Sequence, residues 1–297
     1  MKKYILFLTL MFLVTSCVDD SSGGNSGTNN WRTGIEGITM SLVPDNPPSE
    51  VLSSGKVHVI LKYANKGASS AAPFFYLTGY DPNILSFSNP YVQAPAIGGK
   101  DQYNSVGSQE AFVQWEAPIN MNSLFEVDNF KQALSVTTCY AYETIAYPMI
   151  CIDPQKYNYV EASSCDYSIK DLGSSQGGPI GVTQVKQKST GDEVFLEIHF
   201  QNKGKGTPYI SNGNCLNLRH DEVDMIYLSS VSMSSGSNFV CEPQAIRLIN
   251  NEGYAVCRKG LDNKNSYYES PLKIQVRYNY RDTLPKKEIT IVNVNRK

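Results

Sequence analysis

The three histidines are the first residues to examine for chemistry, because imidazole is a common general base and metal ligand. His58 and His199 fall on the outward faces of predicted strands, which places them on the surface. His220-Asp221-Glu222 could coordinate a cation or supply a base, but such a run of charges is typical of a solvated loop. The histidines therefore predict no catalytic site.

Other catalytic and metal-binding patterns are equally weak. Ser163-Ser164-Cys165 has no histidine partner indicated by the sequence. The sequence contains no Gly-x-Ser-x-Gly elbow, no His-Glu-x-x-His helix and no glycine-rich phosphate loop. Asp81, Asn83 and Asp153 could join a calcium site in loops, although turn-forming Asx residues explain them equally well. The sequence predicts a protein that is not an enzyme and has no cofactor or metal.

The cysteines instead predict disulfides. Besides Cys17, the six cysteines are Cys139, Cys151, Cys165, Cys215, Cys241 and Cys257. An even number in an exported chain favours three bridges. Cys139 and Cys151 point outward from two strands of a predicted hairpin, and Cys241 and Cys257 flank a second hairpin, which leaves Cys165 with Cys215. A zinc site is disfavoured because the sequence has no Cys-x2-Cys pair.

The N-terminus predicts export and anchoring. Two lysines precede an apolar segment, residues 4–14, that is too short to span a membrane. Val14-Thr15-Ser16-Cys17 resembles the lipobox of bacterial-type lipoproteins, which implies lipidation of Cys17; a plain secretory signal is the alternative. The acidic pair after Val18 accompanies cell-surface display in some such proteins. Residues 19–30 contain only Asp, Ser, Gly, Asn and Thr and predict a flexible tether.

A duplication supplies the elements that position these residues. Residues 57–63 place an apolar side chain at every second position and lead into Asn65-Lys66-Gly67. The pattern recurs 137 residues later, at 194–200 followed by Asn202-Lys203-Gly204. Alternation with period two predicts a strand with one buried face, and Asn and Gly tolerate the positive φ of a tight turn. The flanks repeat too: residues 34–39 match 178–183, and 134–142 match 272–280.

About seven short strands in each repeat predict an all-β chain with two tandem immunoglobulin-like antiparallel β-sandwich domains. The predicted order is a signal peptide at 1–16, lipidated cysteine and tether at 17–33, domain one at 34–154, a connector at 155–177, and domain two at 178–297. Residues 134–142 and 149–152 are predicted to form a hairpin. Residues 219–224 are expected to form a short helix.

The strand that ends in Asn65-Lys66-Gly67 or Asn202-Lys203-Gly204 resembles the CARDB-like (cell-adhesion-related) Ig-like domains of bacterial and archaeal envelope proteins. Their hallmark is a strand ending in an Asn-x-Gly turn. The resemblance covers most of residues 34–294 in two copies, and it implies the fold more strongly than a function. The segment Cys139-Tyr140-Ala141-Tyr142 lies outside that general pattern.

Tyrosines are the remaining candidates for recognition. Tyr63, Tyr140, Tyr142, Tyr278 and Tyr280 fall on predicted core faces. Four others, predicted to lie in loops, could supply contact area for a partner: Tyr91, Tyr103, Tyr267 and Tyr268.

Two classes of function follow. The first is an extracytoplasmic, membrane-anchored structural or adhesive protein that contacts a partner or other copies, with surface-layer or filament-like assembly among its forms. The second is a glycan- or peptide-binding module that serves an envelope uptake or enzyme complex. A net charge of −2 is too small to indicate a nucleic-acid partner.

Overall fold

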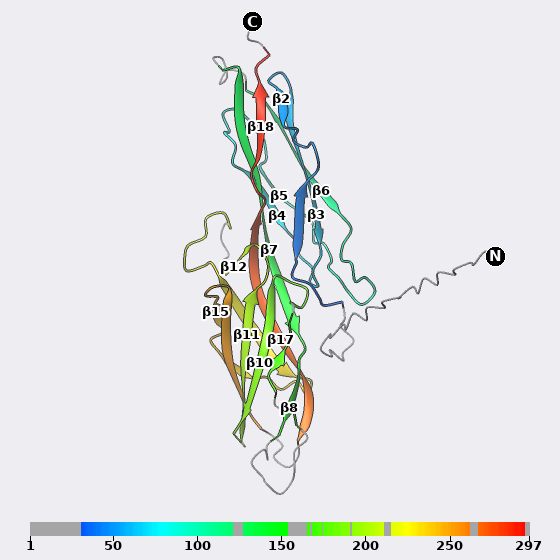
Figure 1. Ribbon diagram of the computed structural model, residues 1–297, viewed down its shortest axis with the longest axis vertical. Coiled ribbons are helices and arrows are strands. Elements are labelled where there is room, and N and C mark those ends of the chain that lie inside the picture. Colours follow the sequence, from blue (N-terminus) through cyan, green and yellow to red (C-terminus); the bar gives the residue numbers. More distant parts are fainter. Residues whose placement is uncertain are drawn as a thin grey trace, which may run out of the picture.

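The computed structural model describes residues 31–120, 127–153, 165–166, 168–173, 175–190, 192–210, 215–261 and 267–294. These residues form an elongated all-β molecule of sandwich-like, antiparallel sheets (Figure 1). In this part of the chain, no helix is long and apolar enough to cross a membrane. The predicted signal peptide and most of the tether lie outside the described residues, as does the first part of the connector.

In the part of the chain that the structure describes, the first repeat contributes eight strands. They are β1 (Ile38–Leu42), β2 (Glu50–Leu52), β3 (Lys56–Asn65), β4 (Phe74–Thr78), β5 (Tyr91–Gln93), β6 (Ala111–Pro118), β7 (Asn129–Ala146) and β8 (Met149–Ile152). Ten more strands follow among the described residues, β9 in the connector and the others in the second repeat. They are β9 (Lys170–Asp171), β10 (Ile180–Ser189), β11 (Glu193–Asn202), β12 (Thr207–Tyr209), β13 (Met225–Met233), β14 (Val240–Glu242), β15 (Ala245–Arg247), β16 (Glu252–Gly260), β17 (Tyr268–Thr283) and β18 (Lys287–Val292).

Three sheets share these strands. One has the order β1-β3-β6, and a second has the order β14-β16-β11-β10-β9. The third, β15-β13-β17-β7-β18-β2, runs through both repeats, and β4, β5, β8 and β12 pair along it. Its two longest strands, β7 and β17, extend over much of the length of the molecule (Figure 1).

The predicted hairpin between residues 134–142 and 149–152 is wrong. Instead, β8 continues in the direction of β7 and pairs with the start of β17, Met149 lying opposite Pro271. Only Tyr147 and Pro148 separate β7 from β8, and this pair lacks the Asn or Gly that a two-residue reversal favours. In the same way, β18 continues β17 and pairs with the start of β7, where Lys287 lies opposite Leu134.

The consequence is an exchange of terminal strands. The last strand of the first repeat, β8, lies beside the second repeat, and the last strand of the second repeat, β18, lies between β7 and β2 of the first. We call the two continuous lines, β7–β8 and β17–β18, the central ribbon. Because buried side chains from both repeats form one contiguous hydrophobic cluster, the molecule is a single rod with a continuous core.

The repeated strands pack as their alternation predicts. Val57, Val59, Leu61 and Tyr63 of β3 are at most 4% exposed, and so are Val194, Leu196, Ile198 and Phe200 of β11. The five tyrosines predicted for the core are buried as well.

The upstream alignment is shifted by two residues. The structure places Ile38 opposite Asn65 and Ile180 opposite Asn202, so Ile38 corresponds to Ile180 and not to Val182. A bulge between Val182 and Gln184 in β10 adds one further residue to the second copy of this strand.

Three local segments differ in part from their predicted structure. Residues 219–224 form turns and not the expected helix. Asn250 and Asn251 both have positive φ, as expected for a tight reversal, but the flanking strands β15 and β16 belong to different sheets. Tyr91, which was predicted to lie in a loop, belongs to the short strand β5, which pairs with β4.

Candidate functional site

The centre of the ribbon carries four inward-facing tyrosines, which we call the tyrosine ladder: Tyr140, Tyr142, Tyr278 and Tyr280. Tyr142 lies opposite Tyr278, with ring centroids 6.1 Å apart, and Tyr140 lies opposite Tyr280 at 5.9 Å. Ala141 lies opposite Asn279 between these pairs. Because the two strands are antiparallel and equivalent, the repeats are related by a pseudo-two-fold axis at this point.

The Asn-Lys-Gly turns hold the hydroxyl groups of the ladder. In the first repeat the Tyr142 hydroxyl donates to Asn65 Oδ1 (3.3 Å), and in the second the Tyr280 hydroxyl donates to Asn202 Oδ1 (3.1 Å). The same two oxygens accept the backbone N–H groups of Gly67 (3.1 Å) and Gly204 (3.2 Å). Each turn is therefore a clamp for a tyrosine from the central ribbon.

The prediction that Gly67 and Gly204 are needed for positive φ is wrong. Neither the glycines nor the asparagines of the two turns are among the residues with positive φ. Instead, a Cβ atom at Gly67 would collide with the Tyr142 hydroxyl, and one at Gly204 would collide with the Tyr280 hydroxyl. Glycine is required because the tyrosine approaches closely, which nothing local in the sequence reveals.

Burial dominates the ionisation of the ladder. It raises the pKa of Tyr142 to about 12, and it raises the pKa values of Tyr140 and Tyr278 well above the ordinary value. The Tyr140 hydroxyl accepts the Ile38 N–H (3.3 Å), and the Tyr278 hydroxyl lies 2.9 Å from the Thr144 hydroxyl. These hydroxyls stay protonated at neutral pH and act as hydrogen-bonding groups of the core.

The opposite face of the ribbon holds a groove of about 380 Å³ at the pseudo-two-fold axis. Ala141 and Asn279 line it, and Tyr209, Ile210 and Tyr227 of the second repeat also contribute. Along the same lining, the Glu143 carboxylate accepts hydrogen bonds from Arg277 Nε (3.0 Å) and Gln275 Nε2 (2.6 Å). The groove thus combines aromatic surface with a locally neutralised pair of charges, features suited to a small polar ligand. Sequence reasoning did not find this site.

All six predicted cysteines form disulfides, and three disulfides indicate an oxidising, extracytoplasmic environment. The predicted Cys241–Cys257 bridge is present and joins directly opposed residues of β14 and β16. The other two predicted pairs are wrong, because the observed bridges are Cys139–Cys215 and Cys151–Cys165. Since β8 continues β7, Cys139 and Cys151 lie along one extended line, about 40 Å apart at the rise of a strand.

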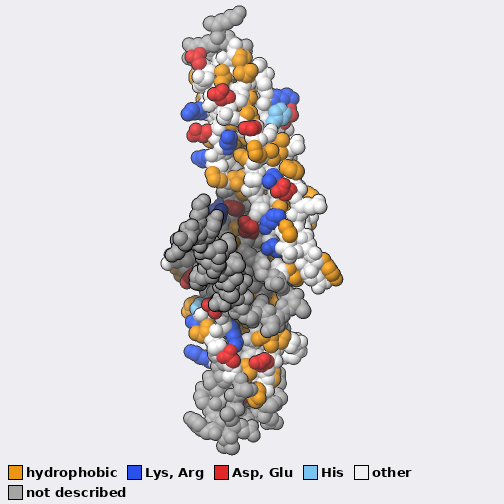
Figure 2. Space-filling model, turned by 45° about the vertical axis from the view of Figure 1, so that its right-hand side comes forward, with side chains coloured by type: hydrophobic (Ala, Val, Ile, Leu, Met, Phe, Trp, Pro, Cys, Tyr) orange, Lys and Arg blue, Asp and Glu red, His pale blue; other side chains and the backbone are white. Residues whose placement is uncertain are grey.

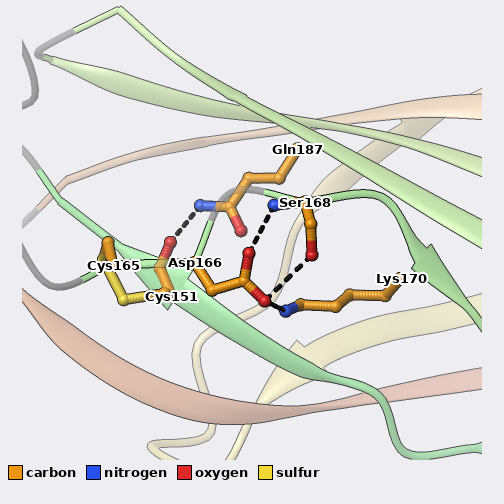
Figure 3. Close-up of polar contacts among 6 residues, drawn as sticks. All are labelled: Cys151, Cys165, Asp166, Ser168, Lys170 and Gln187. Carbon is orange, nitrogen blue, oxygen red and sulfur yellow. Dashed lines mark hydrogen bonds and ion pairs between the residues drawn. A yellow bond between two sulfur atoms is a disulfide. The ribbon is translucent and has the colours of Figure 1, made fainter. Parts of the chain in front are cut away.

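The end of the connector is tied through Cys165 to Cys151 of β8, the strand of the first repeat that lies beside the second (Figure 3). Gln187 of β10 donates to the Cys151 carbonyl. Next to the bridge, the Asp166 carboxylate accepts from the Lys170 ammonium (2.5 Å) and from the Ser168 N–H (2.8 Å). These bonds, the lysine first, hold the pKa of Asp166 well below its usual range. The disulfide and these hydrogen bonds hold the end of the connector against β8, which is a structural role.

The histidines lie apart from one another. His58 is near Glu116 on the first repeat (3.5 Å), and His199 is 2.6 Å from Glu197 and stacks on Tyr254. Among the described residues, no group of three His, Cys, Asp or Glu side chains is arranged to hold a metal ion.

Of the three residues considered for calcium, Asp81 and Asn83 are in contact, and Asp153 lies apart from them. Asp81 accepts from the Asn83 N–H (2.9 Å) in an Asx turn beside the start of β7. Asp153 follows β8 at the opposite end of the same line.

The four candidate recognition tyrosines do not form one site. Tyr103 is 89% exposed, and Tyr91 is 54% exposed in β5, where it stacks on Tyr76. Tyr267 is 50% exposed and immediately precedes β17, and Tyr268, the first residue of β17, is partly buried and packs against the core. Three of the four are therefore available to a partner, but from separate parts of the rod.

No known protein-family model matches this chain, and the search of curated proteins found no match.

Proposed function

We propose that this chain is a lipid-anchored extracytoplasmic protein with two immunoglobulin-like domains, which acts without catalysis by contacting a partner or other copies of itself. The observation that carries the proposal is the exchange of strands β8 and β18, which joins the repeats into one rod. A scaffold or adhesin must keep its binding surfaces at fixed positions. A shared core and three disulfides favour such rigidity.

The point of attachment supports the same role. Gly34 pairs with Gln176 close to the pseudo-two-fold axis, and Lys100 Nζ donates to the Thr33 carbonyl (2.9 Å). A tether that leads from Cys17 to this point would hold the rod at its middle. At full extension a dozen residues reach about 40 Å, which lifts the rod off a membrane and leaves both ends accessible.

The resemblance to CARDB-like domains belongs to this proposal. Its Asn-x-Gly turn has a structural role here, because both copies clamp a tyrosine of the central ribbon. The surface shown in Figure 2 fits a protein that binds by complementarity, since positive, negative and hydrophobic side chains are interspersed over the described part of that face.

Two variants test the anchor and the contacts. Cys17→Ser in the full chain should move the protein from the detergent-extracted membrane fraction to the soluble fraction or block its processing. An unchanged membrane fraction would contradict lipid anchoring.

Changing Tyr91, Tyr103 and Tyr267 together to Ser should weaken partner binding or assembly and leave the melting temperature within a few degrees. Tyr268→Ser is the contrast, because it should destabilise the fold. Turnover of a substrate by the purified chain would overturn the proposal.

The groove favours a second candidate function, the binding of a glycan. Saccharides stack on aromatic rings and bond to planar polar groups such as those of Glu143 and Arg277, which line the groove. Tyr227, which is 40% exposed, is available for such stacking. A glycan array probed with wild type and with Tyr227→Ala tests this function. Tyr254→Ala is the matched control, because Tyr254 is also exposed but lies outside the groove. Equal binding by all three proteins would exclude the groove.

A further inference from the structure

The two repeats differ at the edges of their outer sheets. Tyr63 lies opposite Ala111 and Phe200 opposite Gly253, so β3 corresponds to β11 and β6 to β16. In the second repeat, β14 covers the outer edge of β16 and β9 covers that of β10. Among the described residues, no strand covers the corresponding edges of β6 and β1.

The edge of β6 is the longer of the two. Its nearest cover is a single bridge between Leu85 and Ile119, just beyond the end of the strand. Along β6, Phe112 is 56% exposed, and Gln114 and Glu116 are exposed too. An uncovered edge of this kind is a template for another strand.

The second repeat shows which backbone groups are free. Cys241 and Cys257 lie opposite each other with Cα atoms 4.0 Å apart, the close spacing of a pair that exchanges no backbone hydrogen bonds. The neighbouring residues Val256 and Arg258 must therefore bond to β14. Their counterparts in β6 are Gln114 and Glu116, so the free N–H and C=O groups of β6 belong to these residues and, by alternation, to Phe112.

We propose that β6 is an assembly edge that pairs antiparallel with β6 of a second copy, centred on Gln114. Gln114 then lies opposite Gln114 of the second copy, and Phe112 lies opposite Glu116 of the second copy. The inference rests on the proposed function and names the partner, a second molecule of this chain.

Charge favours this occupant. Within each molecule Lys62 pairs with Glu110 (2.9 Å) and Lys56 pairs with Glu116 (2.5 Å), so both carboxylates beside this edge are already neutralised. Lys62 lies beside Phe112 across β3 and β6, so the pairing also places Lys62 in one row with Glu116 of the second copy. No like charges face each other directly in β6, because Glu116 meets Phe112 and Glu110 meets Pro118. Pro118 has no N–H and ends the new ladder. A two-fold contact of this kind uses the same patch on both molecules and closes as a dimer.

Sedimentation equilibrium of the exported chain carrying Cys17→Ser tests the proposal without interference from a lipid. We expect a dimer at micromolar concentration. Gln114→Lys and Gln114→Glu should each weaken dimerisation roughly tenfold, because like charges then meet at the centre. A mixture of the two variants should restore the dimer. Val256→Lys is the matched control, because β14 covers the corresponding edge, and it should dimerise like wild type.

Three results would overturn the proposal. These are a monomer at every concentration, a dimer that persists in both Gln114 variants, and an open-ended series of oligomers, which would indicate head-to-tail pairing of β6 with β1. Such failure is distinguishable from failure of the proposed function, which is judged by membrane fractionation and by the loop-tyrosine variants.

Discussion

Replacing Asn65 by alanine tests the role assigned to the Asn-Lys-Gly turns. Asn65 is fully buried and makes four side-chain hydrogen bonds. Its Oδ1 accepts from the Gly67 N–H (3.1 Å) and the Tyr142 hydroxyl (3.3 Å). Its Nδ2 donates to the carbonyls of Ser69 (2.7 Å) and Ile97 (3.1 Å).

Asn65→Ala removes all four of these hydrogen bonds. At about 1 kcal/mol of net stability for each bond, the loss is about 4 kcal/mol. Asn202 makes three such bonds, to Gly204, Gly206 and Tyr280, and is 8% exposed, so Asn202→Ala should cost about 3 kcal/mol or less. The first repeat should therefore be the more sensitive.

The assay is unfolding in guanidinium chloride with disulfides intact, followed by near-ultraviolet circular dichroism. The midpoint should fall with an unchanged denaturant dependence. Lys66→Ala, in the same turn, is the control and should change stability by less than about 0.5 kcal/mol. A loss below about 1 kcal/mol in Asn65→Ala, or equal effects of Asn65→Ala and Lys66→Ala, would refute the clamp.

Three further predictions address the ribbon, the disulfides and the tyrosine ladder. Ile289→Ala in β18 should destabilise the protein by about 2–4 kcal/mol and speed hydrogen exchange at residues 129–134 of β7; unchanged exchange there would contradict the strand exchange. Changing Cys139 and Cys215 together to Ser should cost roughly 4 kcal/mol, because the bridge closes a separation of 76 residues, and non-reducing peptide mapping should find this bridge in wild type; recovery of a Cys139–Cys151 peptide would be the contrary result. Burial raises the pKa of Tyr142 to about 12, whereas an unfolded tyrosine titrates near 10. Stability from this group is therefore complete below about pH 10 and is lost as pH rises through about 12, so tyrosinate absorbance should rise together with unfolding; ionisation of the ladder in a fully folded protein would disagree.

Sequence alone predicted the parts of this structure that depend on local pattern. The alternation at Val57–Tyr63 and Val194–Phe200 identified the buried faces correctly, because a half-buried strand must alternate. The Cys241–Cys257 bridge was predicted because its residues flank a short reversal.

The errors arose where the outcome depends on distant partners. Whether the chain reverses or continues at Tyr147-Pro148 is decided by pairing with β17, more than a hundred residues away. The same pairing places Cys139 near Cys215 and leaves Cys151 for Cys165. One signal could have revealed the clamp: Asn65 and Tyr142 recur as Asn202 and Tyr280 at nearly equal offsets, as expected of residues in contact.

The exchange of β8 and β18 makes one rod from two repeats. Differential scanning calorimetry of the disulfide-intact chain tests it most directly. We expect a single transition whose calorimetric and van't Hoff enthalpies agree, because neither repeat keeps a complete sheet when the other unfolds. Two resolved transitions would show instead that the repeats unfold as independent domains, without the cooperation that the shared strands require.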